Sequence, residues 1–181
     1  PNFNNSISKQ ALRNYLKFSY IPAPQSIYKD IFKLEPGTYL TVKLQSASLK
    51  NSIPIKYWDL SEKITKGIKN PILDYHDALH ETKRVLSESV KSQMISDVPL
   101  GSFLSGGIDS SLITSLMQEN STEKIKTFTI GFEDSTFDES KFAKSVANHL
   151  GTNHSEYLIT SQETLDVIPY IPDIYDEPFA D

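Results

Sequence analysis

From residue 74 onward, the chain alternates between apolar runs typical of strands and apolar positions at helical spacing. Short runs rich in apolar and β-branched residues predict strands at residues 98–104, 125–132 and 154–159. Apolar residues that recur every three or four positions predict helices at residues 74–94, 111–119, 141–150 and 164–170. Strands that alternate with helices of this length predict a parallel sheet, with a ligand site at the carboxyl ends of its strands.

Before residue 74 the pattern is less regular. Residues 7–20 carry apolar side chains at helical spacing, which predicts a helix with Ser8 as its N-cap. Short apolar runs predict strands at residues 31–34, 39–44 and 55–58. Polar residues, glycine and proline then interrupt the apolar pattern, so a boundary is predicted between residues 59 and 73.

The string SGGIDSS at residues 105–111 falls between a predicted strand and a predicted helix. Glycines tolerate positive φ, and without Cβ they let backbone N–H groups approach an anion closely. A helix that begins here adds unpaired N–H groups and the positive end of its dipole, which hold phosphate without a lysine. The pattern predicts a pyrophosphate site formed by Ser105, Gly106, Gly107, Ile108, Asp109, Ser110 and Ser111.

Asp109 is the carboxylate of this loop, and a carboxylate beside phosphate is repulsive unless a cation lies between them. Mg²⁺ binds few carboxylates and shares oxygens with nucleotides, so Asp109 is the predicted metal ligand and catalytic residue. Ser, Gly and Asp are also common in turns and helix caps, but the flanking strand and helix favour phosphate binding. The string matches neither GxxxxGK[ST] nor GxGxxG, so it predicts neither of those loops.

A second group of carboxylates lies between the predicted strand 125–132 and the helix 141–150. It consists of Glu133, Asp134, Asp138 and Glu139. These residues could assist a metal ion, but a solvated loop is the favoured interpretation, with Asp138 as the cap of the following helix.

Composition narrows the class of protein. Of the 181 residues 38% are hydrophobic, enough for a core, and no apolar run approaches the roughly twenty residues that cross a bilayer. Because no signal peptide is evident either, we expect a soluble, cytoplasmic protein without a membrane partner. The net charge of −5 and the scattered lysines argue against nucleic acid as a partner. The absence of cysteine excludes disulfides, thiolate metal sites and cysteine nucleophiles within these residues.

Four strings together resemble one family. They are SDVPLGSFLSGGIDSSLI at residues 96–113, IKTFTIGF at 125–132, FDESKFAKSVANHLGTNHSE at 137–156 and YDEPFAD at 175–181, in family order. With them, the chain resembles the synthetase domain of glutamine-hydrolysing asparagine synthetase, a member of the PP-loop ATP pyrophosphatase group. The resemblance implies an α/β fold, similar to the adenine nucleotide alpha hydrolases, with helices on both faces of a parallel sheet and a small α+β segment before it.

The resemblance also implies a domain order. Residues 1–60 correspond to the C-terminal part of an N-terminal-nucleophile glutaminase-like domain, residues 61–73 to a linker, and residues 74–181 to the N-terminal part of the ATP-binding synthetase domain. The start at Pro1 and the end at Asp181, directly after a motif, predict a piece of a longer protein. The family string SGDGGDE is not in these residues, so we expect the piece alone to bind ATP weakly and to be inactive. A homodimer is kept as a candidate assembly.

The implied chemistry is that of an ATP-dependent ligase of amino-acid biosynthesis. The aspartate side chain attacks the α-phosphate of ATP to give β-aspartyl-AMP and pyrophosphate, and ammonia, from glutamine or free, then displaces AMP. Adenine is expected beside Ile130 and Gly131, and the position matching Ile130 contacts adenine in the family. The position of Phe103 does the same but is commonly leucine, so a different pocket shape is expected. Two alternatives stay open: a relative that adenylates another acid, such as a β-lactam synthetase, and a non-catalytic nucleotide-binding module.

Overall fold

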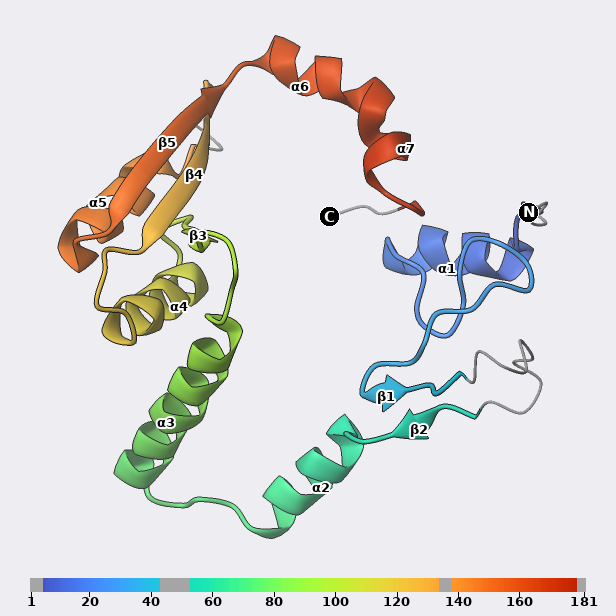
Figure 1. Ribbon diagram of the computed structural model, residues 1–181, viewed down its shortest axis with the longest axis horizontal. Coiled ribbons are helices and arrows are strands. Elements are labelled where there is room, and N and C mark those ends of the chain that lie inside the picture. The colour runs from blue at the N-terminus through green and yellow to red at the C-terminus, as the bar shows by residue number, and fades with distance from the viewer. Residues whose placement is uncertain (1–4, 43–52, 134–137, 179–181) are drawn as a thin grey trace. The chain divides into compact units, whose positions relative to one another are not determined.

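The computed structural model describes residues 5–42, 53–133 and 138–178 (Figure 1). The chain divides into two compact units: unit 1 comprises Pro1–Pro71 and Pro169–Asp181, and unit 2 comprises Ile72–Ile168. Unit 2 contains a three-stranded parallel sheet, and unit 1 contains a two-stranded antiparallel one. Within the described residues, every helix is too short or too polar to traverse a lipid bilayer.

Unit 2 is built on strands β3 (Gly101–Phe103), β4 (Lys126–Phe132) and β5 (Asn153–Ile159), which pair in that order and run parallel. Helices α4 (Ile108–Glu119) and α5 (Ser140–Leu150) connect them, as Figure 1 shows. This arrangement confirms the predicted α/β fold with a parallel sheet flanked by helices. Strand β3 is shorter than the predicted strand 98–104, because Pro99 lacks the N–H that a strand ladder needs.

Helix α3 (Tyr75–Gln93) confirms the amphipathic helix predicted for residues 74–94. Asp74 caps it, because its carboxylate accepts the N–H of Asp77 at 2.9 Å. Val90 of α3 packs in one buried cluster with Leu116 and Met117 of α4. Burying such side chains contributes about 1.5–3 kcal/mol each, so α3 supports the helix that begins at the SGGIDSS loop.

Strand β4 alternates between buried and open side chains. Thr129 and Gly131 are buried on the side that faces the start of α5, where a Cβ on Gly131 would lie 3.2 Å from Ser140 Cβ. Ile130 and Phe132 point to the other side and stay 51% and 41% exposed. Since successive strand residues alternate between faces, the even positions from 128 to 132 form one open apolar row.

Unit 1 begins with helix α1 (Lys9–Phe18), whose predicted cap Ser8 accepts the N–H of Ala11. Strands β1 (Thr38–Tyr39) and β2 (Ile55–Lys56) pair antiparallel over two residues each. Strand β2 lies within the strand predicted at 55–58, whereas β1 shares only Tyr39 with the strand predicted at 39–44. Residues 43–44 of that prediction lie outside the described residues.

The strand predicted at residues 31–34 is wrong, because this segment forms only an isolated bridge between Phe32 and Gln25. The Lys33 N–H donates to the Pro24 carbonyl at 2.8 Å as part of this bridge. The Ile31 carbonyl instead accepts from the Ser26 side chain, whose Oγ lies 2.8 Å away. A bond of this kind offers the backbone an alternative to a strand ladder.

Two helical segments differ from the prediction. Helix α2 (Leu60–Lys69) lies in the segment expected as a boundary, where Asp59 caps it through the N–H groups of two following residues. The predicted helix 164–170 begins earlier, as α6 (Ser161–Val167), because Thr160 and Glu163 form a capping box. The 3₁₀ helix η2 (Ile168–Tyr170) and the short helix α7 (Ile171–Ile174) follow.

Candidate nucleotide-binding site

The loop between β3 and α4 places the start of a helix at the carboxyl end of a parallel strand. Helix α4 begins at Ile108 with Gly107 as its N-cap, and no side chain caps it. Its first N–H groups, those of Ile108, Asp109 and Ser110, have no partner within the helix because the preceding turn is missing. An uncapped helix start with its positive dipole end fits an anionic group such as phosphate.

Two serines hold this loop in shape. The Ser105 N–H donates to Ser110 Oγ at 3.2 Å, and the two hydroxyl oxygens lie 2.9 Å apart. The Gly107 N–H donates to Ser105 Oγ at 3.2 Å, so an incoming phosphate would share or replace this bond. Ser111 lies deeper, and its Oγ is buried without a hydrogen-bond partner among the described residues.

The two glycines of the loop have different roles in its geometry. Gly106 has a φ of +82°, and a Cβ there would lie 2.6 Å from the Ala143 nitrogen and 2.7 Å from the Phe142 carbonyl carbon. Gly107 has a φ of −70°, and a Cβ there would meet only Ser105 Oγ, at 3.3 Å. Gly106 therefore allows the loop to pack against the first turn of α5, whereas Gly107 leaves the mouth of the loop open.

A pocket of about 270 Å³ joins this loop to the open row of β4. It brings together four of the predicted site residues, Phe103, Ser105, Ser110 and Ile130. Glu139 of the predicted acidic group also lines it, together with four residues that were not predicted for the site: Leu104, Phe128, Thr129 and Phe132. Because residues 128, 130 and 132 alternate along one strand, the sequence could have predicted that Phe128 and Phe132 lie on the same face as Ile130.

Gly131 does not line this pocket. It lies on the other side of β4, where a Cβ would come within 2.9 Å of Asp138 Oδ1. Its predicted contact with a nucleotide stays a prediction, and of the two β4 residues predicted beside adenine only Ile130 lines the pocket. The apolar row of Ile130 and the two flanking phenylalanines offers a surface on which a planar base can stack.

The carboxylates fit a metal shared with a nucleotide better than a metal held by protein alone. Asp109 is exposed in the first turn of α4, and Glu139 lines the pocket. No group of three His, Cys, Asp or Glu side chains suited to a metal ion occurs among the described residues. Mg²⁺ takes one or two carboxylates and completes its shell with phosphate oxygens and water, so this donor set fits it. Asp134 of the predicted acidic loop lies outside the described residues.

Glu139 occupies the N-cap position of α5, but the side chain that caps the helix is that of Asp138, one residue earlier. Its two carboxylate oxygens accept the N–H and the hydroxyl of Ser140, each at 3.0 Å. These bonds, with a further one from the Phe132 backbone, hold the pKa of Asp138 below its ordinary value of 3.8. The carboxylate thus links the end of β4 to the turn of α5 against which Gly106 packs.

Replacing Asp138 with alanine is expected to lower the Tm of the complete protein by a few degrees, because the start of α5 loses its acceptor. The contribution is present above the ordinary pKa of 3.8 and is lost as the pH falls through the lower folded-state value. In thermal melts of the native and Asp138→Ala proteins, the Tm difference should therefore be the same at about pH 7 and 5 and smaller at about pH 3. An equal Tm difference at every pH would contradict this role.

The comparison with known families decides the assignment. The family model described as asparagine synthase matches residues 81–181, more than half of the chain. The chain belongs to the asparagine synthase family. A second model, described as a glutamine amidotransferase domain, matches residues 1–58. The predicted resemblance to glutamine-hydrolysing asparagine synthetase is thereby confirmed.

Two relatives named asparagine synthetase match nearly the whole chain, and another matches about half of it. The putative glutamine-hydrolyzing asparagine synthetase 2 of Methanocaldococcus jannaschii is 37% identical over 99% of this chain and 33% of the relative. Asparagine synthetase 1 of Bacillus subtilis is 35% identical over 97% of this chain and 26% of the relative. Asparagine synthetase B of Escherichia coli is 38% identical over 49% of this chain and 18% of the relative. The chain thus spans at most a third of these asparagine synthase family members.

Proposed function

We propose that the complete protein is an ATP-dependent ligase that makes asparagine from aspartate, with nitrogen from glutamine or ammonia. The observation that carries the proposal is the single pocket that joins the uncapped start of α4 to the apolar row of β4. Such a pocket suits a ligand with phosphates at one end and a flat base at the other. ATP has both parts, and the family match and the names of the relatives favour aspartate as the acid.

The proposed first step is substitution at phosphorus. A side-chain carboxylate oxygen of aspartate attacks the α-phosphorus, the bond from that phosphorus to the bridging oxygen breaks, and pyrophosphate leaves with the electron pair. The first N–H groups of α4 would hold the leaving pyrophosphate, since positioned donors stabilise charge where it develops. Mg²⁺ held by Asp109 would offset repulsion between the anionic carboxylate and the phosphates.

The proposed second step is amide formation. The ammonia lone pair attacks the carbonyl carbon of β-aspartyl-AMP, AMP leaves with the bonding electrons, and the nitrogen loses a proton. Residues 1–60 are proposed to belong to the glutaminase-like domain that releases this ammonia, residues 61–73 to the linker, and residues 74–181 to the synthetase domain. The chain contains no cysteine, so a thiol that hydrolyses glutamine would lie outside these 181 residues.

The test uses the complete protein with ATP, Mg²⁺, aspartate and either glutamine or ¹⁵N-ammonium, with products identified by mass. We expect asparagine, AMP and pyrophosphate in equal amounts, with ¹⁵N in the side-chain amide when ammonium is the donor. ADP and phosphate as products, or turnover independent of aspartate, would contradict the proposal. A different amidated acid would indicate a β-lactam synthetase type of relative, and ATP binding without turnover a non-catalytic module.

A further inference from the structure

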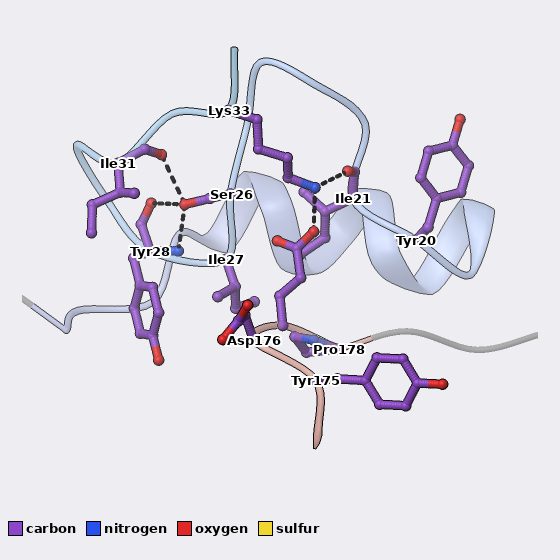
Figure 2. Close-up of a pocket in the computed structure, with 11 residues that line it drawn as sticks. Tyr20, Ile21, Ser26, Ile27, Tyr28, Ile31, Lys33, Tyr175, Asp176 and Pro178 are labelled. Atoms are coloured by element: carbon purple, nitrogen blue, oxygen red, sulfur yellow. Dashed lines mark hydrogen bonds and ion pairs between the residues drawn. The ribbon is translucent and has the colours of Figure 1, made fainter. Parts of the chain in front are cut away.

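A second pocket, of about 760 Å³, lies within unit 1 (Figure 2). Its lining comes from two parts of the chain that are far apart in sequence, residues 20–33 and residues 175–178. Figure 2 shows Tyr175 and Pro178 across from Ile21 and Ile27. The side chains between these segments are mainly apolar, and one ion pair crosses from the first segment to the second.

The ion pair is formed by Lys33 and Glu177. Lys33 Nζ donates to Glu177 Oε1 and also to the Ile21 carbonyl oxygen, the latter at 2.6 Å. The side chains of Lys33 and Glu177 are 35% and 26% exposed. Because both charges are partly withdrawn from water, salt screens them less than it screens a fully exposed pair. The bond to Ile21 fixes the ammonium group, so the pair holds residue 177 in one place.

The two partners belong to different family matches. Lys33 lies in the glutamine amidotransferase match of residues 1–58, and Glu177 lies in the asparagine synthase match of residues 81–181. They are 144 positions apart, yet residues 169–181 form one compact unit with residues 1–71. The pair therefore ties a synthetase segment to the amidotransferase segment.

We propose that Lys33 and Glu177 are positioning residues that couple the two activities of the complete protein. By holding residues 175–178 against residues 20–33, the pair keeps the synthetase segment aligned with the source of ammonia. Losing the pair loosens this alignment, so ammonia released from glutamine is used less efficiently while ammonia supplied from solution is used as before. This inference rests on the proposed function, because it requires glutamine-derived ammonia to be consumed by the synthetase half.

The test compares Glu177→Gln and Lys33→Met with the native complete protein, since both variants keep side-chain size and remove one charge. Asparagine formed per glutamate released is expected to fall about threefold, the scale of a partly exposed ion pair, with ammonium-dependent synthesis unchanged. The charge-reversed double variant, Lys33→Glu with Glu177→Lys, should restore part of the ratio, because it restores the ion pair but not the hydrogen bond to the Ile21 carbonyl. Lys83→Met, which breaks the more exposed Lys83–Glu119 pair at 3.0 Å within unit 2, is the matched control and should leave the ratio unchanged.

Hydrogen exchange gives a second readout that does not depend on synthesis. Peptides covering residues 171–178 should exchange about threefold faster in both single variants than in the native protein. Equal losses of synthesis with glutamine and ammonium, or unchanged exchange in these peptides, would overturn the coupling role. Absence of asparagine from the native protein with both nitrogen sources would instead contradict the proposed function.

Discussion

Replacing Asp109 with alanine in the complete protein is expected to abolish the Mg²⁺-dependent exchange of labelled pyrophosphate into ATP in the presence of aspartate. Asp109 is exposed in the first turn of α4, beside the N–H groups proposed to hold the pyrophosphate. Without its carboxylate, the metal would lose its protein ligand and the phosphates would keep more of their repulsion toward aspartate. A metal supplies several kcal/mol of charge stabilisation, so we expect a loss of at least about a hundredfold.

Two further variants separate charge from shape at this position. Asp109→Asn keeps the side-chain size and should lose nearly as much exchange, whereas Glu123→Ala removes an exposed carboxylate beyond the end of α4 and should have no effect. Raising the Mg²⁺ concentration should recover part of the Asp109→Asn activity if the defect is in metal binding. Exchange at the native rate in Asp109→Ala would remove this residue from the proposed chemistry.

The elements of unit 2 could be predicted because their signals are local. Strand β4 is rich in apolar and β-branched residues, and helix α5 is followed by Gly151, its C-cap, which adopts a φ of 71°. The same signals were present for α2, where Leu60, Ile64 and Ile68 recur every four residues. Gly67, Asn70 and Pro71 have low helix propensity, and they obscured this spacing.

The candidate site could be predicted only in part. The loop of residues 105–111 carries its chemistry within consecutive positions, so the motif alone identified it. Phe128 and Glu139 reach the pocket from β4 and from the start of α5, and their approach depends on how these elements pack around Gly106. Lys33 and Glu177 are 144 positions apart, and no sequence pattern relates their two segments. Their ion pair could therefore be found only from the tertiary structure.

The two adjacent glycines of the loop are expected to respond in opposite ways to substitution. Gly106→Ala should destabilise the complete protein by at least about 2 kcal/mol, because the new Cβ meets backbone atoms of α5 and L-residues disfavour positive φ. Gly107→Val should leave the fold intact, since φ of −70° suits valine and only the Ser105 hydroxyl must adjust. Its branched side chain would stand at the open start of α4 and keep phosphate from the N–H groups.

Thermal melts and ATP titrations by calorimetry distinguish these outcomes. Gly107→Val should keep the native Tm and bind ATP at least about tenfold more weakly, the cost of losing one hydrogen bond to a charged group. Gly107→Ala, with the smaller side chain, should fall between valine and the native residue. Native ATP affinity in Gly107→Val would contradict a phosphate held on the main chain of this loop, even if Gly106→Ala unfolds as expected, because the glycines would then serve packing alone.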